Sequence, residues 1–192
     1  MAEAKAPTIL LVEDDPLFQR TYNAHLLEEG YVVRLASDGE QALQEIEASP
    51  PDLVLLDLLL PRLSGYDVLA RIRADPRLAE LPVIVLTNKG EREDIARAMK
   101  LGATDYFIKF TARPREVLWK LRQVIAKKAG QPAPMRVALR EKELDAEVLA
   151  EAAGKPHDLH CAECGGRLVL ELLPRSEVPG TFEARLVCPK CG

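Results

Sequence analysis

Short apolar runs alternate with longer amphipathic stretches over the first two thirds of this chain. The runs are rich in Val, Ile and Leu and predict five strands, at residues 8–12, 31–35, 53–56, 83–86 and 104–108. The stretches between them show helical spacing, and the last one, at about 114–129, carries an apolar stripe of Val117, Leu121, Val124 and Ile125. Strands that alternate with helices indicate an α/β fold, here a doubly wound five-stranded parallel sheet.

Residues that favour helix ends stand between these runs. Three segments carry helix-start signals, namely Ser37-x-x-Glu40, Ser64-x-x-Asp67, and Asn88 with Glu91 in the following turn. Gly30 and Gly102 stand where left-handed helix ends are expected. The helix boundaries therefore agree with the strand pattern.

Polar side chains follow four of the apolar runs. They are Asp14 and Asp15, Asp57, Thr87 and Lys109. In an open parallel sheet, ligands bind beyond the carboxyl ends of the strands, so we expect these groups to converge on one pocket. Taken singly they have ordinary explanations, since Asp14-Asp15-Pro16 would begin a helix on its own. Together, three carboxylates, a hydroxyl and an ammonium favour a site for a divalent cation and a phosphoryl group.

In order and spacing, residues from about 7 to 129 resemble the receiver domain of two-component response regulators. The resemblance rests on Glu13-Asp14-Asp15-Pro16, on Asp57 with Leu60-Pro61-Arg62-Leu63-Ser64-Gly65, on Leu86-Thr87, and on Gly102-Ala103-Thr104-Asp105-Tyr106 leading to Lys109. It implies a flavodoxin-like strand order and a phosphorylation-dependent response regulator of a two-component signalling system. The phosphoryl group would come from a sensor histidine kinase or a phosphotransfer protein. The resemblance also implies a phosphoacceptor switch rather than an enzyme, because a receiver catalyses only its own phosphoryl transfer.

The resemblance further implies a role for each residue of the pocket. Asp57 would be the phosphoacceptor. Mg²⁺ would be bound chiefly by Asp15, with Asp14, Asp57 and the backbone carbonyl of Leu59 as further ligands. Lys109 would pair with a phosphoryl oxygen as a compact ammonium.

Two further residues are expected to form the switch. Thr87 would donate its hydroxyl to the phosphoryl group, and Tyr106 would fill the space that Thr87 leaves. The expected output face then comprises residues 90–101, 104–108 and 114–129, and a homodimer through the 90–129 face is compatible with it.

The chain departs from the receiver pattern at a few positions. Lys109 precedes Phe110, where receivers usually have a proline after a cis peptide bond, and a cis bond before a non-proline residue costs about 3–4 kcal/mol. Asn88 is larger than the usual residue at its position and would narrow the pocket. Leu59 and Lys89 are poorly suited to orient an attacking water, which predicts slow loss of the phosphoryl group.

A proline-containing segment, residues 130–134, interrupts the α/β pattern. Residues 135–153 are rich in Ala, Leu, Glu and Arg and predict one helix. A connecting helix is preferred to a coiled coil because fewer than three heptads are present. The chain is therefore divided into a receiver domain at 1–129, a linker with a connecting helix at 130–156, and a small module at 157–192.

All four cysteines lie in this last module, as Cys161-x-x-Cys164 and Cys188-x-x-Cys191. Two such pairs suit a closed tetrahedral Zn²⁺ site, which would be structural rather than catalytic. Segments 167–173 and 181–187 predict two strands between the pairs, so the module resembles a zinc ribbon. The sequence from Cys188 to Gly192 also resembles a rubredoxin knuckle, which keeps iron as an alternative.

Composition sets limits on partners and location. No apolar run is long enough to span a membrane, and the start of the chain lacks the profile of a secretion signal, so a cytoplasmic protein without a membrane partner is expected. The net charge of −4, and five basic against five acidic residues from Lys155 onward, argue against binding of nucleic acid by bulk charge. A protein target of the ribbon is therefore preferred. The alternatives are a transcription regulator whose ribbon contacts DNA or RNA polymerase, and a constitutive zinc-stabilised scaffold.

Overall fold

The computed structural model describes residues 6–130, 135–138, 160–161, 163–174 and 182–191. The chain forms two compact units, Met1–Leu121 and Arg122–Gly192, which we consider separately. None of the helices in the described part of the chain is long and apolar enough to cross a membrane.

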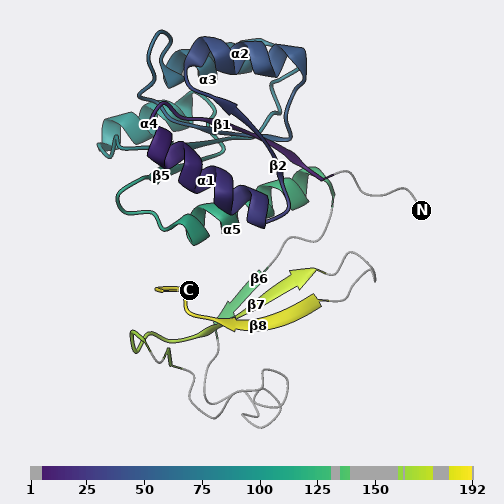
Figure 1. Cartoon of the computed structure of the whole chain (residues 1–192), viewed down its shortest axis with the longest axis vertical. Helices are drawn as coiled ribbons and strands as arrows, with labels where there is room; N and C mark the ends of the chain where they lie inside the picture. The colour runs from purple at the N-terminus through teal and green to yellow at the C-terminus, as the bar shows by residue number, and fades with distance from the viewer. Residues whose placement is uncertain (1–5, 131–134, 139–159, 162, 175–181, 192) are drawn as a thin grey trace, which may run out of the picture. The chain divides into compact units, whose positions relative to one another are not determined.

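The first unit is an α/β sandwich built on a parallel sheet (Figure 1). Its elements in chain order are β1 (Thr8–Val12), α1 (Pro16–Glu28), β2 (Val32–Ala36), α2 (Gly39–Ala48), β3 (Leu53–Leu56), α3 (Gly65–Ala74), β4 (Val83–Thr87), α4 (Arg92–Lys100), β5 (Asp105–Ile108) and α5 (Pro114–Lys128), the last of which runs into the second unit. The strand order is β2-β1-β3-β4-β5, with every pair parallel. The predicted five-stranded doubly wound sheet is thus confirmed.

The central strands are apolar throughout because helices cover both faces of the sheet. One face carries Leu10, Val12, Val54, Leu56, Val83 and Val85, which pack with buried residues of α2, α3 and α4. The alternate strand residues are also buried, and α1 and α5 lie on the opposite side from α2 and α3 (Figure 1). This double cover leaves the ends of the strands as the places where polar groups meet.

Several helix ends follow the predicted chemistry. Ser64 is the N-cap of α3, where its hydroxyl accepts a hydrogen bond from the backbone N–H of Asp67 at 3.3 Å. Gly30 and Gly102 have φ angles of 82° and 96°, in the left-handed region that glycine enters without strain.

Two predicted helix starts were wrong. The cap of α2 is Asp38 rather than Ser37, because the buried Asp38 carboxylate accepts from the backbone N–H of Gln41 at 2.9 Å. The start of α4 is not capped by Asn88. That helix begins at Arg92 with Glu91 as N-cap, because the chain after β4 first forms a loop.

The second unit contains a three-stranded antiparallel sheet in the order β6-β7-β8 (Figure 1). β7 (Val169–Pro174) and β8 (Phe182–Val187) confirm the two strands predicted near 167–173 and 181–187. β6 (Met135–Ala138) pairs with the other edge of β7. The prediction of a helix at 135–153 was therefore wrong over 135–138, where pairing with β7 satisfies the backbone. Residues 139–153 lie outside the described part of the chain.

Candidate functional site

Three carboxylates gather at the carboxyl end of the parallel sheet. One oxygen each from Glu13, Asp14 and Asp57 lies within 4.8 Å of the others. Glu13 is the first residue beyond β1 and Asp57 the first beyond β3, and the parallel register that pairs Val12 with Leu56 places them side by side. The topology of the sheet thus brings these acids together across about 45 residues of sequence.

The Lys109 ammonium lies between two of these acids. Its Nζ is 2.5 Å from Asp57 Oδ2 and 2.8 and 2.6 Å from Oε1 and Oε2 of Glu13. All three side chains are almost inaccessible, with exposed fractions of 2%, 4% and 3% for Lys109, Asp57 and Glu13. The aromatic ring of Phe18 on α1 covers the ammonium, with its centroid 4.8 Å from Nζ. Lys109 is therefore fixed against the acid that it is predicted to assist.

Burial and ion pairing have opposite effects on the pKa values of Lys109 and Glu13. Burial by itself would lower the pKa of Lys109, but the hydrogen bonds to Asp57 and Glu13 outweigh it and raise the pKa. Burial raises the pKa of Glu13, and Lys109 offsets only part of that rise. When all are ionised, three carboxylates and one ammonium leave two negative charges in excess. A divalent cation with hard oxygen ligands would balance that charge.

Asp15, predicted as the chief metal ligand, does not belong to this group of carboxylates. Its Oδ1 accepts hydrogen bonds from the backbone N–H groups of Leu17 and Phe18, at 2.7 and 3.2 Å, and caps α1 ahead of Pro16. The structure places Glu13 in the cluster instead. Glu13 was not among the predicted site residues, although it is the first polar residue after β1.

The backbone around Asp57 is held by its neighbours. The N–H of Leu59 donates to Asp57 Oδ1 at 2.9 Å, while the predicted role of the Leu59 carbonyl remains a prediction. Gly65, at the start of α3, lies so close that a Cβ there would stand 2.1 Å from the Asp57 carbonyl oxygen. Any other residue at this position would push α3 away from the acid. The Lys109–Phe110 peptide bond is trans, and the Phe110 side chain is 79% exposed.

Thr87 and Tyr106 meet at the loop that follows β4. Thr87 is completely buried, and its Oγ1 accepts a long hydrogen bond, 3.5 Å, from the backbone N–H of Lys89. The Tyr106 hydroxyl donates to the Lys89 carbonyl at 2.9 Å. Burial, with smaller effects of Asp94 and Asp57, raises the pKa of Tyr106 to about 12. Both predicted switch residues therefore contact the same loop residue.

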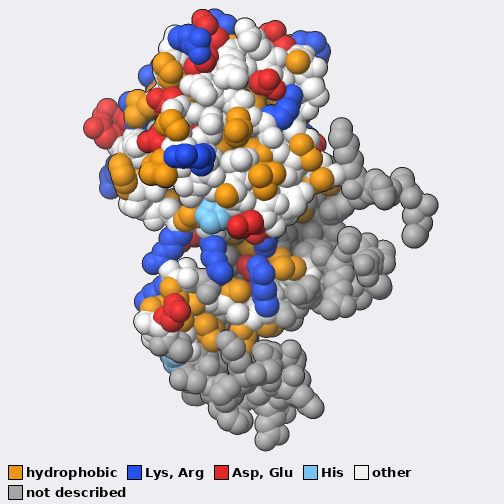
Figure 2. All heavy atoms as spheres, viewed as in Figure 1, with side chains coloured by type: hydrophobic (Ala, Val, Ile, Leu, Met, Phe, Trp, Pro, Cys, Tyr) orange, Lys and Arg blue, Asp and Glu red, His pale blue; other side chains and the backbone are white. Residues whose placement is uncertain are grey.

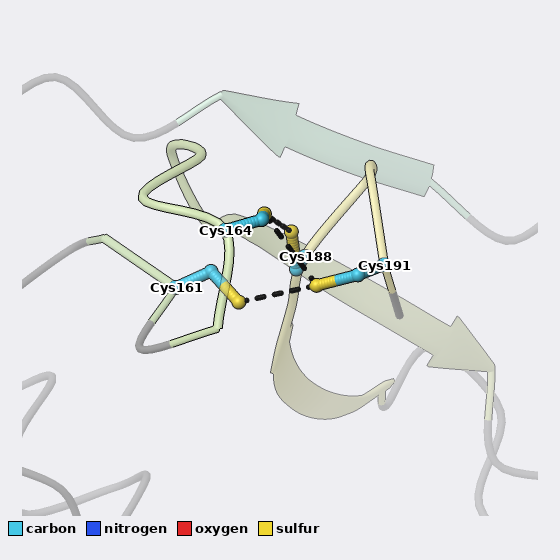
Figure 3. A group of neighbouring side chains, drawn as sticks. All are labelled: Cys161, Cys164, Cys188 and Cys191. Carbon is cyan, nitrogen blue, oxygen red and sulfur yellow. Dashed lines mark hydrogen bonds between the residues drawn. The ribbon is translucent and has the colours of Figure 1, made fainter.

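The four cysteines converge in the second unit (Figure 3). Their Sγ atoms lie within 4.8 Å of one another, with Cys161 to Cys191 at 3.2 Å and Cys164 to Cys188 at 3.5 Å. One pair comes from the turn that precedes β7 and the other follows β8. The N–H of Lys190 points to Cys188 Sγ at 3.4 Å, as backbone amides do around sulfur ligands.

The backbone beside these sulfurs leaves no room for a further side chain at Gly166. A Cβ on Gly166 would stand 3.0 Å from Lys190 Cδ and 3.2 Å from Cys164 Sγ. The N–H of Cys161 donates to the Gly166 carbonyl at 2.8 Å, which closes the turn. Four soft donors at this spacing fit a tetrahedral Zn²⁺ or iron site.

The comparisons with known proteins agree with the geometry of the first unit. Residues 9–121, more than half of the chain, match the response regulator receiver domain family, and the chain belongs to that family. One relative is the DNA-binding response regulator MtrA of Mycolicibacterium smegmatis. It is 35% identical over 137 residues, which are 71% of this chain and 58% of that protein. The chain thus spans less than two thirds of that relative's length.

Solved receiver structures show the same likeness. The receiver domain of a Pseudomonas aeruginosa sensor histidine kinase, solved with magnesium coordinated in its active-site cleft, is 35% identical with a TM-score of 0.59 and covers 63% of this chain and 98% of that chain. The BeF3-activated receiver domain of Klebsiella pneumoniae RstA is 30% identical with a TM-score of 0.57 and covers 62% of this chain and 97% of that chain.

Proposed function

We propose that this chain is a phosphorylation-dependent response regulator that accepts a phosphoryl group on Asp57. The observation that carries the proposal is the buried Lys109 ammonium, held 2.5 Å from Asp57 Oδ2 beside a cluster of three carboxylates. Membership of the receiver family supports it, because a receiver takes its phosphoryl group from a histidine kinase or another phosphodonor.

The chemistry follows from these contacts. A carboxylate oxygen of Asp57 attacks the phosphorus, and the bond from phosphorus to the donor nitrogen or oxygen breaks. Lys109 neutralises charge on a phosphoryl oxygen, and the Thr87 hydroxyl donates to another. The chain thereby catalyses its own modification and is a switch rather than an enzyme.

We assign the magnesium site to the clustered acids. Asp14 and Asp57 would hold the ion, with Glu13 beside them on Lys109, whereas the Asp15 carboxylate is engaged in capping α1. When bound, Mg²⁺ supplies positive charge that stabilises the developing charge on the phosphoryl oxygens.

A direct experiment tests the phosphoacceptor. The full chain is incubated with Mg²⁺ and a small acyl phosphate, and its intact mass is measured. One phosphoryl group should be added to the native chain and to an Asp52→Asn control, whose substitution lies just before β3, at the opposite end of that strand from Asp57. Asp57→Asn should gain none. Undiminished labelling of Asp57→Asn would refute the assignment.

The cysteine cluster supports a second, structural role for metal. We propose that Cys161, Cys164, Cys188 and Cys191 hold one Zn²⁺ that stabilises the β6-β7-β8 unit. A sheet of three short strands buries little apolar surface, so a bound metal would supply much of its folding free energy. Four thiolates also suit iron, which elemental analysis distinguishes from zinc.

The target of this second unit has two candidates. The sequence favours a protein partner, because basic and acidic residues are balanced from Lys155 onward. On the first unit, too, basic and acidic side chains are interspersed over the visible face (Figure 2). The relative named as a DNA-binding response regulator favours the other candidate, a transcription regulator that contacts DNA or RNA polymerase. Of these two we favour the transcription regulator.

Salt dependence separates the two candidates. Affinity of the phosphorylated chain for duplex DNA should fall steeply with salt if phosphate contacts drive binding. No binding to duplex DNA or RNA polymerase, together with phosphorylation-dependent capture of another protein, would favour the protein partner.

A further inference from the structure

Lys89, in the loop between β4 and α4, is held at each of its polar groups. Its N–H donates to Thr87 Oγ1 at 3.5 Å, and its carbonyl accepts from the Tyr106 hydroxyl at 2.9 Å. Its ammonium lies 3.0 Å from Asp94 Oδ1 on α4. Three different elements therefore fix this one residue, two positions after Thr87.

Asp94 is itself anchored from α3. The Tyr66 hydroxyl donates to the same Asp94 Oδ1 at 2.7 Å, and the Tyr66 side chain is buried. The guanidinium of Arg97 lies over the Tyr66 ring, 4.0 Å from its centroid. The hydrogen bonds from Tyr66 and Lys89 lower the pKa of Asp94, so its carboxylate is ionised at neutral pH. We call Tyr66, Lys89 and Asp94 the Asp94 anchor.

The Asp94 anchor lies where phosphorylation of Asp57 must act. Thr87 is fixed within the sheet by its register with Ile108, and the loop that contains Lys89 begins directly after it. A phosphoryl group brings new acceptor oxygens next to the Thr87 hydroxyl. If Thr87 Oγ1 moves toward them, the hydrogen bond that it accepts from the Lys89 N–H, already 3.5 Å long, is lost unless Lys89 follows.

We propose that Asp94 is a positioning residue for phosphorylation of Asp57. By holding Lys89, Asp94 opposes the loop movement that lets Thr87 engage the phosphoryl group. The inference rests on the proposed function. On this proposal, the contact between α3, α4 and the loop controls the stability of the phosphorylated state. Release of Lys89 should therefore favour that state.

Binding of beryllofluoride, an analogue of the phosphoryl group, provides the test. The full chain with Mg²⁺ is titrated and bound fluoride is followed by ¹⁹F NMR. Asp94→Asn and Lys89→Gln should each bind roughly 1.5-fold to fivefold more tightly than the native chain, which is the range for one partly exposed ion pair. The double variant should bind no more tightly than either single variant, because both remove the same interaction.

The controls separate the possible failures. Asp75→Asn removes another local ion pair, with Arg77 beyond the end of α3, and should leave the affinity unchanged. Equal or weaker binding by both Asp94→Asn and Lys89→Gln would overturn the inference, and a merely structural Asp94 would give that result. If Asp94→Asn does not fold, Lys89→Gln decides alone. No binding by the native chain would overturn the proposed function itself, and this inference with it.

Discussion

Neutralising Asp14 should stabilise the fold in the absence of metal. This exposed carboxylate has two like charges, on Glu13 and Asp57, within 4.8 Å. At that distance and the dielectric constant of water, each pair repels by about 0.9 kcal/mol. The Lys109 ammonium, which pairs with Glu13 and Asp57, offsets part of this repulsion, so Asp14→Asn should raise the free energy of unfolding by about 1 kcal/mol.

Urea unfolding monitored by Trp119 fluorescence measures this change. Trp119 is the only tryptophan, and it lies in the first unit, so the signal reports chiefly on the unfolding of that unit. With a chelator present, the unfolding midpoint of Asp14→Asn should rise by about 0.5 M, given a slope of about 2 kcal/mol per M. With Mg²⁺ the native chain should gain stability by mass action, and the variant should gain much less because it has lost a ligand.

Two outcomes would contradict this reasoning. A less stable Asp14→Asn in chelator would mean that the carboxylates do not repel one another as placed. Equal stabilisation of both proteins by Mg²⁺ would mean that Asp14 is not a ligand. Glu47→Gln, an exposed acid on α2 away from the cluster, is the matched control and should respond to Mg²⁺ as the native chain does.

Three more predictions concern the switch and the cysteines. Phosphorylated Asp57 should decay slowly, and Leu59→Asn should speed the decay followed by intact mass, because the Leu59 side chain cannot orient a water; equal decay rates would refute this. Elemental analysis should find one zinc per chain, and Cys161→Ser should lose it. After chelation, amide protection should be lost only in the second unit. Metal-free protein purified under reducing conditions would count against the site. Because the pKa of Tyr106 is raised to about 12, its hydroxyl stabilises the fold fully below pH 10 and loses that effect as pH rises toward 12. Tyr106→Phe should accordingly lose part of the tyrosinate absorbance change near pH 12, and an unchanged titration would show that Tyr106 ionises elsewhere.

The sequence predicts best the strands that are buried on both faces of the sheet. The bounds of β1 and β3 were predicted without error, because these strands are buried on both faces and read as unbroken apolar runs. The start of α4 and the strand β6 were missed for a common reason. Each contacts a partner outside its own segment: β6 pairs with β7, and the loop before α4 accepts a hydrogen bond from Tyr106 at the Lys89 carbonyl.

The site shows the same division. Asp57, Thr87 and Lys109 were located by their positions at the ends of predicted strands. Asp15 was preferred to Glu13 because the resemblance to receivers was taken to imply it, yet the residue next to Asp57 is set by strand register. Counting one residue beyond each strand would have found Glu13 without a structure.

The order of strands in the second unit has a practical consequence. β7 is the central strand, and its two neighbours come from opposite sides of the first cysteine pair in the chain, β6 before it and β8 after it. A fragment that starts at the cysteines would leave one edge of β7 without its partner. Exposed strand edges recruit other chains, so such a fragment should self-associate even with its metal bound. An expression fragment of this unit should therefore begin before Met135.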